Sequence, residues 1–218
     1  MKKYKYDRKG STLIMLLLTI SVIVLIGTMA MSLAVINFKM KKTHSSFKQC
    51  FYLAEAGIDE SFIMTIDFVD KAVNYALSKV DEFDEIEEPV NSILDYSILS
   101  LENELIEERR NIVFIKAFKN FIKGNCTDIS PNHSLITELK NNESYVVYNN
   151  GYPKIYPEIT ENTDYFLIEV KSTYMEGYLK EELTLKYKIF IPNYNDYIEN
   201  TDLKPVDIIR IIEWKKER

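Results

Sequence analysis

The residue types that most often carry chemistry are scarce in this chain of 218 residues. Histidines and cysteines number two each, and neither pair has the close spacing that holds a metal ion. The sequence also lacks a glycine-rich phosphate loop and the G-x-S-x-G turn that presents a nucleophilic serine. We therefore expect no catalytic residue, no cofactor-binding residue and no metal ligand, and we predict that the protein is not an enzyme. The two histidines are His44 and His133, and the two cysteines are Cys50 and Cys126.

One dense group of possible metal ligands is acidic. Residues 81–88 place six carboxylates in eight positions, and Pro89 follows them. Carboxylate oxygens suit a hard cation such as calcium, but a calcium loop alternates Asp or Asn with other residues and needs a glycine at its turn. That pattern is missing here. We interpret the segment as a solvated connection, and a cation site is the alternative.

The two cysteines leave two interpretations open. Cys50 and Cys126 are separated by 75 residues, and a disulfide in an exported domain would close that long loop. Two cysteines alone do not define a disulfide framework, however. The alternative is that both are buried as free thiols.

The element that must position everything else is an apolar segment near the N-terminus. Leu13 to Val35 is a run of 23 residues without a charge, which as a helix reaches roughly 35 Å and is enough to cross a bilayer core. A secretory signal has a shorter apolar region, and its small-residue cleavage site lies after that region. Here the small residue, Gly10, precedes the apolar run, directly after a basic leader.

Two motifs indicate a family. Gly10-Ser11-Thr12-Leu13 after the basic leader resembles the processing site of type IV prepilins, and FYLAEAGI at residues 51–58 resembles a patch of the PilX-like minor pilins. The resemblance implies that a prepilin peptidase cuts after Gly10 and that Ser11 becomes the N-methylated first residue. It also implies partners among other pilin subunits and the pilus assembly machinery. The helix-packing patch would be Ala54, Glu55, Ala56 and Gly57.

The chain departs from the family at the start of the mature protein. Typical pilins begin with Phe or Met and carry Glu as the fifth residue, whereas this chain has Ser11 and Met15. In the family that Glu is thought to pair with the terminal ammonium of a neighbouring subunit, and the pseudopilin thought to cap type II secretion filaments likewise lacks it. Leu13 and Met15 are therefore expected to act in assembly, and Met15 implies a subunit at or near the filament tip.

Charge is divided unevenly along the chain. Residues 43–218 hold 19 basic and 32 acidic residues, a net of −13, so we expect no nucleic acid partner. Five basic residues precede the span and four lysines follow it. Positive charge is usually found on the cytoplasmic side, and this difference of one barely decides the orientation of the span. The resemblance implies a single-pass protein of the cytoplasmic membrane with its N-terminus inside and its head outside, at the cell surface after assembly.

The helix should continue well past the span. Small and apolar residues recur at intervals of three and four with no proline before Pro89, which predicts one helix from Ser11 to Val80 with a single buried stripe. Packing of the Ala54–Gly57 patch against a filament core and packing against the chain's own sheet both fit. The predicted stripe comprises Phe47, Cys50, Ala54, Ile58, Ser61, Thr65, Val69, Ala72, Ala76 and Val80.

A second helix and then strands are expected after the acidic segment. The second helix runs from a cap at Ser92 to about Lys123, although 111–118 fits a strand equally well. Its predicted apolar side comprises Leu94, Ile98, Leu101, Leu105, Ile112 and Phe118. Residues 125–142 are interpreted as a loop, 145–148 as a strand before the turn at 149–151, and 206–214 as a last strand with a basic tail.

A hairpin decides the fold class. Residues 165–175 and 183–191 alternate polar and apolar positions on either side of a turn at Glu176-Gly177. In the second arm one face is apolar, so a helix must cover it, and the stripe of the long helix is suitable. We predict an α+β protein with a pilin-like architecture and an additional helix inserted before a small antiparallel sheet. Its parts are a leader (1–10), a membrane or filament-core helix (11–36), the continuation of that helix (37–80) and an exported head (81–218).

Two further functions remain as alternatives to a structural pilin. The first is a signal-anchored exported domain that binds or senses a ligand and never polymerises. The second is a tethered enzyme, which no recognisable constellation of side chains supports. The glycine at the cytoplasmic edge favours the pilin interpretation, because a static anchor gains nothing from it.

Overall fold

The computed structural model describes residues 9–86, 96–126, 128, 133–141, 152–199 and 204–217. The chain divides into two compact units, Met1–Lys48 and Gln49–Arg218. A single helix, α1 (Lys9–Ile86), passes through both. The predicted helix over 11–80 is therefore confirmed.

The first unit consists of the N-terminal part of α1. Its large apolar side chains are exposed from Leu13 to Met40, and in the described chain this is the one helix long and apolar enough to cross a membrane. The threonine and serine hydroxyls within it are satisfied locally. Thr19 and Ser21, for example, each donate to the carbonyl oxygen three residues earlier at 2.9 Å. Such bonds leave few polar groups to solvate in an apolar surrounding.

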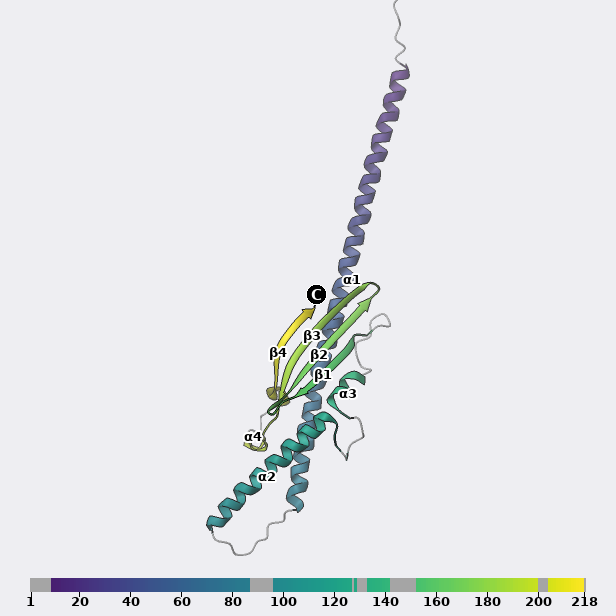
Figure 1. The fold of residues 1–218 in the computed structure, drawn as a ribbon. Coiled ribbons are helices and arrows are strands. Elements are labelled where there is room, and N and C mark those ends of the chain that lie inside the picture. Colours follow the sequence, from purple (N-terminus) through teal and green to yellow (C-terminus); the bar gives the residue numbers. More distant parts are fainter. Residues whose placement is uncertain are drawn as a thin grey trace, which may run out of the picture. The chain divides into compact units, whose positions relative to one another are not determined.

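The second unit is built on a four-stranded antiparallel sheet, which Figure 1 shows in the order β1-β2-β3-β4. Its strands are β1 (Lys154–Glu161), β2 (Tyr165–Glu176), β3 (Leu179–Phe190) and β4 (Ile209–Glu217). The predicted hairpin is β2 and β3, joined through Gly177 with φ +61°. A positive φ at this position suits a two-residue hairpin turn and favours glycine.

The main core lies between the sheet and α1. Nine of the ten residues predicted for the stripe of the long helix are buried, and Phe47 alone is exposed, at 39%. The apolar residues of β3 face them as predicted. Tyr187 meets Phe62 edge-on, with ring centroids 5.5 Å apart. The class is therefore α+β, with a long N-terminal helix packed on a four-stranded antiparallel sheet. The facing sheet residues are Phe166, Ile168, Val170, Ser172, Leu183, Leu185, Tyr187 and Ile189.

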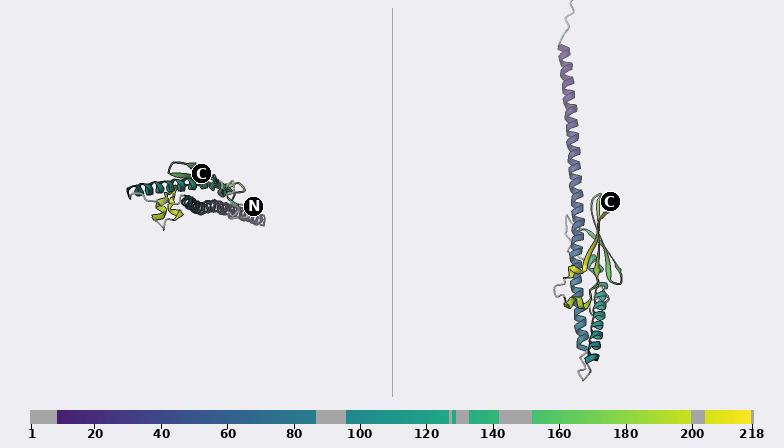
Figure 2. Two further views of the ribbon diagram at one scale, coloured as in Figure 1. Left: turned by 90° about the horizontal axis from the view of Figure 1, so that it is seen from below. Right: turned by 90° about the vertical axis from the view of Figure 1, so that its left-hand side faces the viewer.

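The additional helix is α2 (Tyr96–Lys123), which runs alongside the C-terminal part of α1 in both views of Figure 2. Residues 111–118 belong to it, so the strand interpretation of this segment was wrong. The contact is aromatic. Phe121 lies 5.1 Å from Phe68 and 5.2 Å from Tyr75 of α1, measured between ring centroids.

The predicted apolar side of α2 is wrong at two of the three positions whose side chains the structure describes. Leu105 and Ile112 are exposed, at 55% and 58%, and of the described members Phe118 is buried. The buried side chains that the structure describes in α2 lie in its C-terminal half, where large residues recur at the helical spacing. Periodicity over the whole segment averaged this half with residues 104–112, most of which are exposed. The buried residues are Phe114, Ala117, Phe118, Phe121 and Ile122.

The acidic segment is partly helical rather than a connection, which corrects the interpretation of residues 81–86. These residues complete α1, because basic side chains offset their mutual repulsion. Lys79 pairs with Glu82 at 2.8 Å on the same helix, and Arg110 of α2 pairs with Asp84 at 2.8 Å. In the described chain, no group of three or more candidate ligands could hold a metal ion. Residues 87–95, with the predicted Ser92 cap, lie outside the described residues.

A short helix replaces part of the loop predicted for 125–142. Helix α3 (Leu135–Asn141) begins after Ser134, whose hydroxyl accepts a hydrogen bond from the Thr137 amide at 3.2 Å. This is the bond of an N-cap, and Leu135 and Leu139 then fall four apart on a buried side. The candidate strand at 145–148 and its turn lie outside the described residues.

Sequence periodicity missed β1 and α4 (Tyr194–Glu199). Pro157 interrupts the pattern of β1, but proline is tolerated because β1 is an edge strand. The last strand was predicted three residues too early. Residues 205–208 form a 3₁₀ turn, η1 (Pro205–Ile208), and β4 continues through Lys215 and Lys216, which had been interpreted as a tail. Lys216 pairs at 2.8 Å with Glu181, which is 4% exposed.

Candidate functional site

The predicted processing site lies at the start of α1. Gly10 and Ser11 fall in the first turn of the helix, which begins at Lys9. The two predicted assembly residues follow on the same helix and are exposed, Leu13 at 62% and Met15 at 71%. Both side chains are therefore available to an apolar surrounding or to another helix.

Met15 also borders a shallow groove on the surface of α1. The groove measures about 420 Å³, and Thr19 lies in it one turn after Met15. Because the Thr19 hydroxyl donates to the Leu16 carbonyl, the groove presents mainly hydrocarbon. It suits a lipid chain or a neighbouring apolar helix better than a polar ligand. Its lining is Met15, Leu18, Thr19, Val22 and Ile23.

The helix-packing patch is divided between two environments. Ala54 and Gly57 are buried, whereas Glu55 and Ala56 are half-buried. A Cβ atom placed on Gly57 would lie 2.6 Å from Ser172 Oγ of β2 and 2.8 Å from Cγ of Pro153. Of the two partners that fitted the patch, Gly57 therefore contacts the chain's own sheet, and Ala54 is buried in the same core. Glycine here is a requirement of close helix-to-sheet approach.

A buried hydrogen-bond chain next to the patch was not predicted. The Tyr187 hydroxyl of β3 donates to Thr65 Oγ1 at 2.6 Å, because Thr65 itself donates to the Ser61 carbonyl at 2.9 Å. Ser61 in turn donates to the Gly57 carbonyl at 2.6 Å. Sequence alone assigned Ser61 and Thr65 to the stripe. The two hydroxyl groups, at helical spacing within an apolar stripe, were the sequence signal that could have indicated a tyrosine partner.

The two cysteines are free, so the disulfide alternative is wrong. Cys126 hydrogen-bonds to Tyr75, and burial followed by that bond raises the pKa of Tyr75 to about 12. Tyr75 lies 25 positions after Cys50 on α1, roughly 37 Å of helix, whereas a disulfide needs Cα atoms within about 7 Å. Burial, and then the nearby Glu176 carboxylate, raises the pKa of the Cys50 thiol. It therefore stays protonated at neutral pH and is a weak nucleophile.

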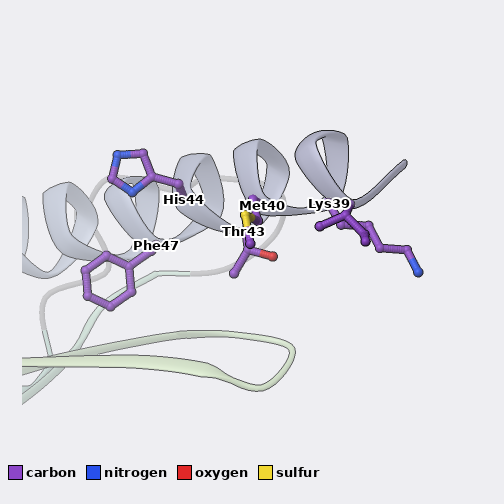
Figure 3. Close-up of a pocket in the computed structure, with 6 residues that line it drawn as sticks. Lys39, Met40, Thr43, His44 and Phe47 are labelled. Carbon is purple, nitrogen blue, oxygen red and sulfur yellow. The ribbon is translucent and has the colours of Figure 1, made fainter. Parts of the chain in front are cut away.

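The histidines occupy different settings. His133 packs at a tilt against Phe68 and edge-on against Phe121, with ring centroids 5.3 Å and 5.8 Å away, so it contributes to packing of the second unit. His44 belongs to the first unit and lines a groove on α1 after the apolar run. Figure 3 shows it in succession with Lys39, Met40, Thr43 and Phe47 along the helix.

These features define a class of architecture: a small antiparallel sheet packed on a long helix whose N-terminal part is apolar and exposed enough to cross a membrane. No protein-family model, curated protein or solved structure matches the chain.

Proposed function

We propose that the protein is a structural minor pilin or pseudopilin of a type IV pilus-like filament. In this proposal a prepilin peptidase removes residues 1–10 at the cytoplasmic membrane. The mature chain then joins other pilin subunits through the assembly machinery and reaches the cell surface. The single observation that carries the proposal is α1 (Lys9–Ile86). This one helix holds the prepilin-like Gly10-Ser11 bond in its first turn, exposes an apolar run and then packs on the chain's own sheet.

The exposed apolar run supports this proposal on physical grounds. Burial of apolar surface contributes about 25 cal/mol per Å², so helix surface bearing Leu, Ile and Val side chains is costly to leave in water. Lipid covers such a surface in a membrane, and neighbouring helices cover it in a filament. A helix that is continuous from this run into a packed head transfers between those two settings without refolding.

Processing at Gly10 gives the direct test. Mass spectrometry of the membrane-extracted protein should show a chain that starts at Ser11, with the mass of one added methyl group on the new amine. Gly10→Leu should leave the full-length chain in the membrane, because a bulky side chain blocks access to the bond. The matched control is Gly27→Leu within the span, where a Cβ atom meets nothing within 4 Å, and it should be processed normally.

Two outcomes would favour the signal-anchored domain instead. They are an intact Met1 in the wild-type protein, and a cut beyond residue 30. The Ala54–Gly57 patch does not discriminate between these functions, because Gly57 contacts the sheet of its own head.

Met15 supports a position at or near the filament tip. A carboxylate in hydrocarbon costs a few kcal/mol unless it is paired, and the first subunit of a filament has no earlier neighbour to supply an ammonium group. Methionine at this position avoids that cost and leaves the amine of Ser11 available for the glutamate of the next subunit. The exposure of Met15 on α1 is consistent with contact along a filament core.

The tip position has its own test. Gold label attached to the head should appear at one end of sheared filaments, and label spread evenly along them would exclude a tip role. Met15→Glu should lower the number of filaments without affecting processing at Gly10. Met29→Glu, on the same exposed run, separates the position-specific effect from the general cost of a carboxylate in the span.

A further inference from the structure

Four lysines follow the apolar run of α1, and all four are exposed. They are Lys39, Lys41, Lys42 and Lys48, and no acidic residue occurs between Asp7 and Glu55. In the described chain, no ion pair includes any of the four. This region therefore carries a concentrated positive charge that the first unit does not neutralise.

The lysines surround the helix instead of forming one face. Successive residues of an α-helix are turned by about 100°. Lys39 and Lys42, three apart, thus share one side, whereas Lys41 and Lys48, seven apart, share the opposite side. We call this arrangement the lysine collar. A partner helix or strand docks on one face of a helix, so it would leave half of the collar unneutralised.

Apolar side chains alternate with the collar. Phe38 and Met40 are 70% and 65% exposed. A groove of about 480 Å³ lies beside Met40, with the small residue Thr43 in it and Phe47 at its end (Figure 3). Such a surface offers hydrocarbon contact directly next to ammonium groups. Free water-soluble anions gain nothing from the hydrocarbon, whereas phospholipids use both.

Three of the four collar lysines also lie at the right depth. Lys39 is four residues beyond Val35, the end of the uncharged run, and four residues correspond to roughly 6 Å of helix. When the run fills a bilayer core of about 30 Å, this distance places Lys39 among the phosphate groups, since headgroups extend the bilayer to about 40–45 Å. Lys41 and Lys42 follow within one further turn of the helix. Long lysine side chains also reach along the helix axis toward that layer.

We propose that the lysine collar binds the headgroups of anionic phospholipids in the leaflet from which α1 emerges toward the head. The inference rests on the membrane span of the proposed function but requires neither cleavage nor polymerisation. Its consequence is an energetic barrier to extraction, because a subunit that leaves the membrane must give up these headgroups. Replacement contacts in a filament must then neutralise the charges that the headgroups leave.

Lipid selectivity of the full-length chain tests the proposal. The protein is held in neutral detergent micelles and titrated with phosphatidylglycerol or with phosphatidylcholine of the same acyl chains, and native mass spectrometry counts bound lipids. One lysine near an anionic surface contributes about fivefold in affinity. Three lysines at headgroup depth should therefore give a preference for phosphatidylglycerol on the order of 100-fold.

Two variants with the same change in net charge separate the collar from general electrostatics. Replacing the four collar lysines with glutamine should bring the preference to within about twofold of unity. Glutamine at four exposed lysines of the second unit should leave it unchanged, and circular dichroism checks that both variants keep their helix. These control positions are Lys116, Lys140, Lys154 and Lys215.

Three results would overturn the inference. They are equal binding of both lipids by the wild type, an equal loss of preference in both variants, and displacement of phosphatidylglycerol by excess inorganic phosphate at constant ionic strength. The last would indicate a free-phosphate site. Failure of processing at Gly10 would contradict the proposed function and leave this lipid preference intact, so the two failures are distinguishable.

Discussion

At the scale of single residues, Gly57 shows how closely helix and sheet approach. The nearest atoms to a Cβ at this position belong to Ser172 on β2 and to Pro153, just before β1. The Ser172 hydroxyl is buried and finds no hydrogen-bond partner in the described chain. A buried hydroxyl without a partner is costly, so this small side chain is better explained by the space it leaves for the helix than by its polarity.

Gly57→Ala should therefore destabilise the head. Alanine improves helix propensity by about 1 kcal/mol, but overpacking a filled site costs about 1–3 kcal/mol. The contacts at 2.6 Å and 2.8 Å fall on the short, buried side chain of Ser172 and on the ring of Pro153, and neither is the far end of a long flexible side chain. We expect a net loss of about 1 kcal/mol in the free energy of unfolding, measured by urea titration of residues 43–218. The control, Asp59→Ala, changes an exposed position on the same helix and should stay within about 0.5 kcal/mol of wild type. A more stable Gly57→Ala would contradict the close approach.

At the scale of elements, the β2–β3 hairpin has two different faces. One face is apolar and covered by α1, and the other carries paired charges. Glu169 lies directly opposite Lys186 in the strand register, with Oε2 and Nζ 2.9 Å apart. The hydrogen bond from Lys186 lowers the pKa of Glu169 below its ordinary value of 4.5. A half-exposed pair of this kind contributes about 0.5–1 kcal/mol.

The lowered pKa of Glu169 predicts a pH dependence of stability. A carboxylate whose pKa is lower in the folded state stabilises the fold above its unfolded pKa, and the contribution is lost as pH falls through the folded pKa. Glu169→Gln should thus lower the free energy of unfolding at pH 7 and have little effect near pH 3. Urea titrations of residues 43–218 at the two pH values measure this. Glu104→Gln, an exposed α2 position with no ion pair in the described chain, is the control. An equal effect of Glu169→Gln at both pH values would mean that the pair contributes nothing.

At the scale of the molecule, charge separates two regions of the chain. Residues 1–42 hold eight basic residues and one acidic residue, whereas residues 43–218 carry a net of −13. The compact second unit, Gln49–Arg218, contains the whole sheet and its helical cover. We therefore expect residues 43–218 to fold as a soluble α+β domain without the span, with a circular dichroism spectrum that contains both helix and strand. A spectrum without strand signal would contradict this expectation.

The acidic head should bind no duplex DNA. Its net charge opposes the phosphate field, and salt of about 150 mM screens charges beyond about 8 Å, which leaves only local patches to act. Residues 43–218 should flow through a duplex-DNA column at that salt. Retention there would show that a local basic patch outweighs the net charge.

The sequence by itself determined the long helix, its buried stripe and the central hairpin. These elements have strong periodicity, and each repeats one environment over many residues. The stripe from Cys50 to Val80 needed no knowledge of its partner, because any sheet with a covered apolar face would select the same residues. The implied processing at Gly10 and tip role of Met15 come from a resemblance and remain predictions.

Only the tertiary structure decided the elements that depend on a neighbour. Helix α1 continues through Asp84, where Arg110 on α2 offsets its charge. The buried side chains described in α2 lie in the half that meets Phe68 and Tyr75. Pro157 is tolerated because β1 is an edge strand, which the local sequence cannot reveal. The sequence likewise did not determine that Gly57 packs against the chain's own sheet. Helical spacing specifies that a face is buried, whereas the distance to Ser172 specifies what buries it.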